Sequence, residues 1–155
     1  MNGAYWHIAT NHIPVVATPF IAVLLGWGLY RKSQEVVKVA YVAAVAVALV
    51  TIFVLKTGES AERVAHEIPG IQMETIHKHE EAADFGFWAA EIVGALSLIG
   101  LWLGRRGAFS TRWGIFVLVV ALWASVVEAR VAHLGGLIRH PEIQAGPANS
   151  EIKDG

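Results

Sequence analysis

The chain has 155 residues, of which 55% are hydrophobic and 16% charged, and its formal net charge is −1. The absence of cysteine excludes disulfides, thiolate metal sites and covalent attachment of haem through a CxxCH motif. A near-neutral charge gives no electrostatic basis for binding nucleic acid. The mean hydropathy of +0.50 favours an integral membrane protein instead.

Four apolar runs are long enough to cross a membrane, which takes roughly 20 mainly apolar residues. They cover 13–30, 36–55, 85–104 and 113–127, and the last can be extended to about Leu134. In lipid the backbone must satisfy its own hydrogen bonds, and the alternation typical of a membrane β-barrel is absent. The sequence therefore predicts an all-α fold: an up-down-up-down four-helix transmembrane bundle within residues 1–143, with helices at about 12–31, 35–56, 72–104 and 111–134, and then a flexible polar tail at 144–155.

The segments between the runs differ in charge. Segments 31–38 and 105–112 are short, and each holds three Lys or Arg residues. The N-terminus, segment 56–84 and the C-terminal tail hold most of the acidic residues. By the positive-inside rule, the two short segments face the cytoplasm, and both termini face the periplasm of a bacterial inner membrane.

All the histidines lie on the predicted periplasmic side: His7, His12, His66, His77, His79, His133 and His140. For any one of them an ordinary surface position is the alternative. However, His12, His79 and His133 stand at similar depth on three separate helices, whose ends converge in an antiparallel bundle. Imidazole is the commonest metal ligand and an axial ligand of haem. The joint pattern therefore predicts a cofactor site at the periplasmic end.

The third apolar run carries a stripe of small residues below His79. The stripe has two interpretations, close helix packing or room for a flat macrocycle; its members are Ala83, Gly86, Ala90, Gly94 and Ser97. A zinc or copper ion needs three or four ligands, and the HKH motif directs its two rings about 200° apart, so one helix cannot chelate with both. We therefore expect haem b, with copper or zinc as the alternative.

Charged residues accompany the predicted site. Arg130 and Arg139 lie on the histidine side, where each would either bind a haem propionate or extend toward lipid headgroups. Glu91 lies deep in the third run and Glu128 in the outer part of the fourth. Acidic groups are costly within a bilayer and are candidates for a functional role.

Two segments are expected to close the periplasmic end of the bundle. Residues 57–70 are predicted to form a short helix that ends at Pro69-Gly70 and crosses the mouth of the bundle. The pair Gly135-Gly136 is predicted to end the last helix. The chain after this pair would then fold back and bring His140 to the site.

The motifs HIATNHIP, KTGES, HKHEEAA and AHLGGLIRHPEI resemble those of a group of bacterial four-helix inner-membrane proteins of unknown activity. The resemblance extends to about residue 143, and its matched positions are His7, His12, His79, His140, Gly135 and Gly136. Similar domains occur fused or adjacent to Rieske-type and cytochrome modules, which implies redox work. The plan is also similar to that of four-helix b-type cytochromes. The chain departs from their pattern because no histidine lies on the cytoplasmic side, so a relay between two stacked haems is not expected.

We expect a b-type cytochrome that binds one or two haems and transfers electrons, rather than an enzyme in its own right. The first expected ligand pair is His12 with His79, and the second is His7 with His140. His133 is a further candidate ligand. Expected partners are membrane lipid, a quinol, and a periplasmic cytochrome or Rieske-type protein. The alternatives are a periplasm-facing copper or zinc protein and a non-catalytic anchor subunit of a respiratory complex. Association with further copies of the chain is also open.

Overall fold

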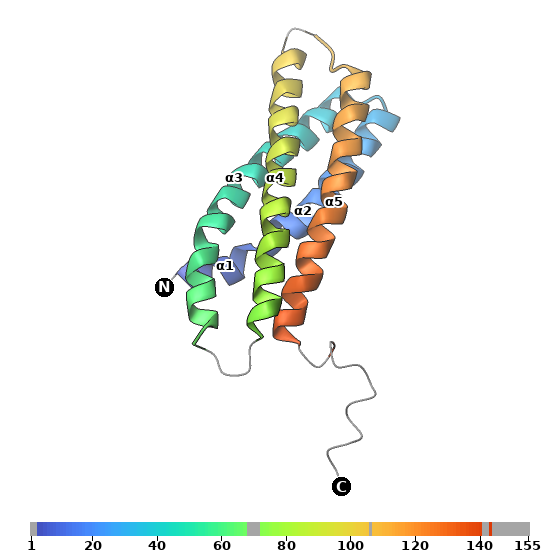
Figure 1. The fold of residues 1–155 in the computed structure, drawn as a ribbon. Coiled ribbons are helices and arrows are strands. Elements are labelled where there is room, and N and C mark those ends of the chain that lie inside the picture. Colours follow the sequence, from blue (N-terminus) through green and yellow to red (C-terminus); the bar gives the residue numbers. More distant parts are fainter. Residues whose placement is uncertain (1–2, 68–71, 106, 141–142, 144–155) are drawn as a thin grey trace.

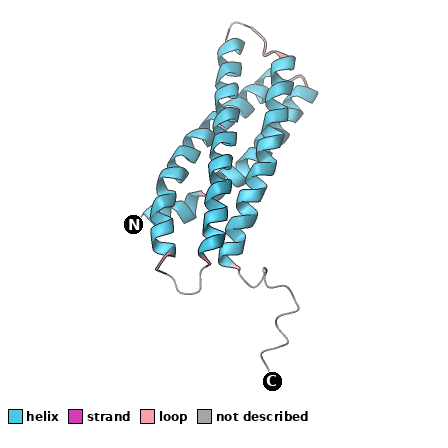
Figure 2. Cartoon of the chain, viewed as in Figure 1, coloured by secondary structure: helices cyan, strands magenta, loops and turns pink. Residues whose placement is uncertain are grey.

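The computed structural model describes residues 3–67, 72–105, 107–140 and 143, and the elements found among them are helices (Figures 1 and 2). Four helical segments among these residues are long and apolar enough to cross a membrane, and α1 and α2 together form the first of them. The prediction of an all-helical protein with four potential membrane spans is therefore confirmed. The helices are α1 (Gly3–Thr10), α2 (His12–Tyr30), α3 (Gln34–Ala65), α4 (Met73–Gly104) and α5 (Thr111–Arg139).

The four long helices form a bundle in which each packs mainly against two others. The packed pairs are α2 with α3, α3 with α4, α4 with α5, and α5 with α2. The short helix α1 packs on α3. Figure 1 shows α1 near the end of the bundle where α3 finishes, α4 begins and α5 finishes. We call this the histidine end, and we call the opposite end, formed by segments 31–38 and 105–112, the basic end.

Small residues in α4 allow close approach of its two neighbours. A Cβ atom added at Gly94 would lie 2.5 Å from the Cβ of Ala48 in α3. One added at Gly86 would lie 3.1 Å from a methyl carbon of Val131 in α5. Such contacts bring helix backbones together where there is no hydrophobic driving force between helices in lipid. At these two positions the small-residue stripe serves helix packing.

The basic end is fixed by caps and by hydrogen bonds between segments. Ser33 and Ser110 cap α3 and α5, each accepting a backbone N–H bond through its hydroxyl. The backbone N–H of Phe109 donates to the side-chain oxygen of Gln34 at 2.5 Å. The indole N–H of Trp113 donates to the carbonyl of Leu96 at 3.1 Å. These bonds tie the start of α3, the end of α4 and the start of α5 together.

Two predictions about the histidine end are wrong. Residues 57–65 do not form a separate helix but continue α3 to Ala65, and Pro69-Gly70 lies outside the described residues. The pair Gly135-Gly136 does not end α5, which runs on to Arg139. Glycine costs about 1 kcal/mol in a helix interior relative to alanine, which packing against a neighbouring helix can offset. The sequence pattern also does not predict α1 as a separate helix.

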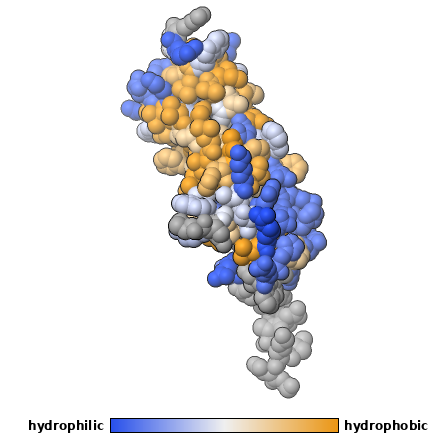
Figure 3. All heavy atoms as spheres, turned by 90° about the vertical axis from the view of Figure 1, so that its left-hand side faces the viewer, coloured by the Kyte–Doolittle hydropathy of each residue, from blue (hydrophilic) through white to orange (hydrophobic). Residues whose placement is uncertain are grey.

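The histidine end extends beyond the apolar part of the molecule. Helices α3 and α4 have 32 residues each, which is about 48 Å at 1.5 Å per residue, against a hydrocarbon thickness of roughly 30 Å. Their polar parts are 56–65 and 73–84. Figure 3 shows a broad hydrophobic region and, on the lower side, an extended hydrophilic one. The histidine end therefore combines an apolar bundle with a polar extension.

Candidate functional site: two docked histidines

His7 of α1 is anchored to the backbone of α3. Its Nδ1 lies 3.1 Å from the carbonyl oxygen of Val54. Since a carbonyl only accepts hydrogen bonds, Nδ1 carries the proton and donates. Gly58, four residues after Val54, faces the imidazole, and a Cβ added there would lie 3.6 Å from its Cε1. The hydroxyl of Thr57 donates to the same carbonyl at 2.9 Å. The imidazole of His7 thus lies directly against the α3 backbone.

His79 of α4 is anchored to α5 in the same way. Its Nδ1 lies 3.2 Å from the carbonyl oxygen of Val131. Gly135 follows Val131 by four residues, and a Cβ added there would lie 3.1 Å from Cε1 and 3.4 Å from Nδ1 of His79. These distances are tighter than ordinary van der Waals contact. The glycine is therefore what lets the imidazole reach the backbone of α5.

The two sites share one arrangement, which we call a docked histidine. In each, an imidazole donates from Nδ1 to a valine carbonyl and lies beside a glycine four residues further on; an added Cβ would make ordinary contact with the ring at Gly58 and a tight contact at Gly135. When a neutral imidazole carries its proton on Nδ1, Nε2 has the free lone pair that binds a metal. The imidazoles of His7 and His79 are both half-buried. The geometry presents two pre-oriented nitrogen ligands from different helices.

Small residues place α1 on α3. A Cβ added at Gly3 would lie 2.5 Å from the hydroxyl oxygen of Ser60, and Ala4 is buried. The indole of Trp6 packs edge-on against Phe53, with 6.4 Å between the ring centroids. These contacts flank His7 on its helix. They hold α1 against α3 in a position from which the imidazole reaches the Val54 carbonyl.

The other residues predicted for the site lie on the surface. His12 is the first residue of α2, His133 is on α5, and His140 follows the last residue of α5; all three are exposed. Arg130 and Arg139 on α5 are exposed as well. The structure therefore places His7 and His79 against the backbones of neighbouring helices, whereas His12, His133 and His140 are exposed.

The remaining histidines contact carboxylates. His77 lies 3.4 Å from an oxygen of Glu81 on the exposed face of α4, while His79, two residues on, reaches α5. His66 lies 3.6 Å from an oxygen of Glu62. The two rings of the HKH motif thus make different contacts, as expected from helix geometry. Across the described part of the chain, no three His, Cys, Asp or Glu side chains are grouped so that they could hold a metal ion.

A buried carboxyl group lies near the docked His79. Glu128 of α5 is 3% exposed, and a Cβ added at Gly86 of α4 would lie 3.5 Å from its Oε1. Gly86 is seven residues from His79, about 10 Å along α4. Further along α4, Oε1 of Glu91 is buried without a hydrogen-bond partner. The α4–α5 interface therefore carries an acidic group in its interior, close to the histidine end.

The sequence pattern identifies the two histidines but not the carbonyl groups to which they donate. The acceptors at Val54 and Val131 are main-chain atoms, which no side-chain pattern reveals. A usable signal is the glycine in KTGES and the pair in AHLGGL, since glycine inside a long helix marks a close approach of another group. No family model, curated protein or solved structure matches the chain. The docked histidines are therefore the observation on which a function can be based.

Proposed function

We propose that the protein is a membrane-bound electron-transfer protein that holds one haem b between His7 and His79. The observation that carries this proposal is the matched pair of docked imidazoles, each with Nδ1 bonded to a backbone carbonyl. Metal-ligating histidines almost always donate their second ring N–H to a carbonyl or carboxylate, which fixes the tautomer and ring orientation. Both imidazoles already meet this condition, and they come from different helices.

The donor set fits this cofactor. Noncovalent haem needs no cysteine, and the chain has none. Low-spin b haems take two neutral imidazoles, whereas a closed zinc or copper site wants three or four ligands in one group. The pairs expected from the sequence, His12 with His79 and His7 with His140, remain predictions. The pair His7 and His79 is preferred because each of its rings is already oriented by the backbone.

Once bound, haem supplies reversible one-electron transfer at its iron. The chain's own groups set the conditions for it. The carbonyls of Val54 and Val131 orient the ligands and raise their basicity. Gly135 leaves space for the ring of His79. Arg130, exposed on α5, is a candidate to hold a propionate at the polar edge, as is Arg139.

The proposed topology places the site at the periplasmic face. The basic end carries six Lys or Arg residues in segments 31–38 and 105–112, with Glu35 as their one acid. The positive-inside rule puts such segments in the cytoplasm. The bundle would then run up-down-up-down in a bacterial inner membrane, with both termini periplasmic. Electrons would pass from a quinol or a membrane partner to a periplasmic cytochrome or Rieske-type protein.

The experiment is a haem count on ligand variants. The detergent-purified protein, expressed with ample haem, is compared with His7→Ala and His79→Ala by pyridine haemochrome. His12→Ala and His77→Ala are the matched controls, each near a docked histidine in sequence. We expect about one haem per wild-type chain, loss of haem in the first two variants and full content in the controls.

Other outcomes would replace the proposal with a defined alternative. Loss of haem in His12→Ala with full content in His7→Ala would move the ligand pair to His12 and His79. Colourless protein from haem-sufficient cells would refute the cytochrome proposal. Elemental analysis would then separate a copper or zinc protein, with near-stoichiometric metal, from a metal-free anchor subunit.

A further inference from the structure

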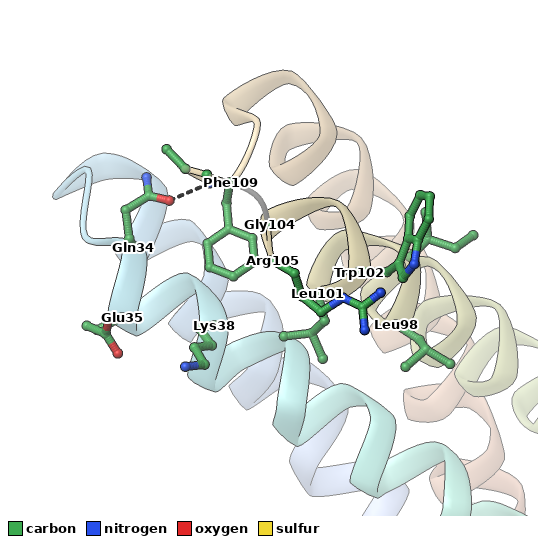
Figure 4. Close-up of a pocket in the computed structure, with 12 residues that line it drawn as sticks. Gln34, Glu35, Lys38, Leu98, Leu101, Trp102, Gly104, Arg105 and Phe109 are labelled. Carbon is green, nitrogen blue, oxygen red and sulfur yellow. Dashed lines mark hydrogen bonds between the residues drawn. The ribbon is translucent and has the colours of Figure 1, made fainter.

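The basic end carries a groove that the electron-transfer proposal does not use. It lies between the start of α3 and the end of α4, has a volume of about 850 Å³, and is also lined by Gly107, Ala108 and Phe109 of the connection to α5. Figure 4 shows Lys38 extending from α3, and Arg105 extending from the end of α4 on the side of Trp102. This volume falls in the range of small-molecule and cofactor sites.

The groove has a defined end wall. The ring of Phe109 packs against Gly104, where an added Cβ would collide with it, and edge-on against Tyr41, with 5.6 Å between ring centroids. The side-chain oxygen of Gln34 accepts a hydrogen bond from the backbone N–H of Phe109. These contacts fix the connecting segment over the start of α3. The groove is therefore shaped by packed groups and not by a gap between loose loops.

The lining changes from apolar to basic along the helices. Leu98, Ile99 and Trp102 of α4 are exposed apolar residues, with 57%, 44% and 58% of their surface accessible. Lys38 and Arg105 directly flank the apolar stretches 39–55 and 85–104. In a membrane-spanning helix this is the depth of the lipid headgroups, where Trp and basic residues concentrate. The apolar part of the groove then faces acyl chains, and its basic part faces headgroups.

The two cations of the groove are available to an anion. Among the described residues, neither Lys38 nor Arg105 forms an ion pair. Glu35 is the acidic group in the lining, and the two segments that build the basic end add four further Lys or Arg residues. A site with an apolar floor, an excess of positive charge and a tryptophan at the boundary matches an amphipathic anion.

We propose that this groove binds an anionic phospholipid, with the phosphate between Lys38 and Arg105 and an acyl chain along Leu98 and Trp102. A lipid is favoured over a soluble partner because the exposed apolar floor belongs to a helix long and apolar enough to span the membrane. Each basic residue near an anionic headgroup strengthens binding about fivefold. This proposal is independent of the haem.

The test is native mass spectrometry of the full chain released from nanodiscs that contain equal amounts of phosphatidylglycerol and phosphatidylcholine. The wild type is expected to retain phosphatidylglycerol in preference. The double variant Lys38→Gln/Arg105→Gln is expected to lose this preference, with about a fivefold fall for each charge removed. The charge-conserving variant Lys38→Arg/Arg105→Lys controls for folding and should keep it. Lys56→Gln/Lys78→Gln, with two lysines removed at the histidine end, should keep it as well.

Three results would overturn the proposal. The first is equal retention of the two lipids by the wild type. The second is a preference for phosphatidylglycerol that survives Lys38→Gln/Arg105→Gln, because the basic residues of the groove would then not be what binds the headgroup. The third is loss of preference in the charge-conserving variant, since the site would then depend on packing and not on charge.

Discussion

Two neighbouring glycines of α5 should respond differently to the same substitution. A Cβ added at Gly135 would lie 3.1 Å from Cε1 of His79, whereas one added at Gly136 meets nothing within 4 Å. Both residues are helical, so alanine should gain about 1 kcal/mol of helix propensity at each. At Gly135 the imidazole must first move away.

The cost of that movement follows from the hydrogen bond it disturbs. Ordinary carbon–carbon contact needs about 3.5 Å or more, so the ring of His79 must shift by several tenths of an ångström. Its bond to the Val131 carbonyl is already 3.2 Å long, at the upper limit of good geometry. Losing it costs about 1 kcal/mol, which cancels the gain in propensity. We expect Gly136→Ala to raise the melting temperature by about 2–4 °C and Gly135→Ala to leave it unchanged.

The assay is thermal unfolding in detergent followed by tryptophan fluorescence, together with the haem count. Gly135→Ala should also lower haem affinity, by about fivefold if the lost bond is worth 1 kcal/mol to the bound ligand. Gly58→Ala is a further control, because its Cβ would lie at an ordinary 3.6 Å from His7. Equal melting temperatures and equal haem contents for Gly135→Ala and Gly136→Ala would refute the docked-histidine geometry.

Helix packing and topology give two further predictions. Gly94→Ala should lower the melting temperature, because its Cβ would lie 2.5 Å from that of Ala48 and overpacking costs about 1–3 kcal/mol. Gly26→Ala should not, because its Cβ would lie at an ordinary 3.7 Å from its nearest neighbour. An equal fall in both variants would show that the close α3–α4 contact at Gly94 is not the cause. Because the chain has no cysteine, single-cysteine variants report topology: an impermeant maleimide should label Glu59→Cys in intact cells, and Arg112→Cys only after permeabilisation. The reverse pattern would contradict the proposed orientation.

The long helices were predictable because their signal is local. An apolar run of about 20 residues has few alternatives to a membrane-spanning helix, and all four such runs are helical in the structure. The position of His79 before the third apolar run predicts that it faces the site. Its hydrogen bond to α5 could not be predicted, because the acceptor is a main-chain carbonyl.

The errors concern the histidine end, where distant segments decide the structure. Helix α1 is too short to be stable by itself, and its position depends on Gly3 and Ala4 fitting against α3. The continuation of α5 through Gly135 occurs where that residue contacts His79, 56 residues earlier in the chain. Local propensity predicts a helix end at Gly-Gly, and it contains no information about such a contact.

The most direct test of the central claim is the oxidised and dithionite-reduced visible spectrum of the wild-type protein beside His7→Ala, His79→Ala and the double variant. Ligation by two imidazoles predicts a Soret band with sharp reduced α and β bands in the wild type, and loss of the haem spectrum in each single variant and in the double variant. An unchanged low-spin spectrum in the double variant, or a flat spectrum from haem-sufficient wild type, would contradict it.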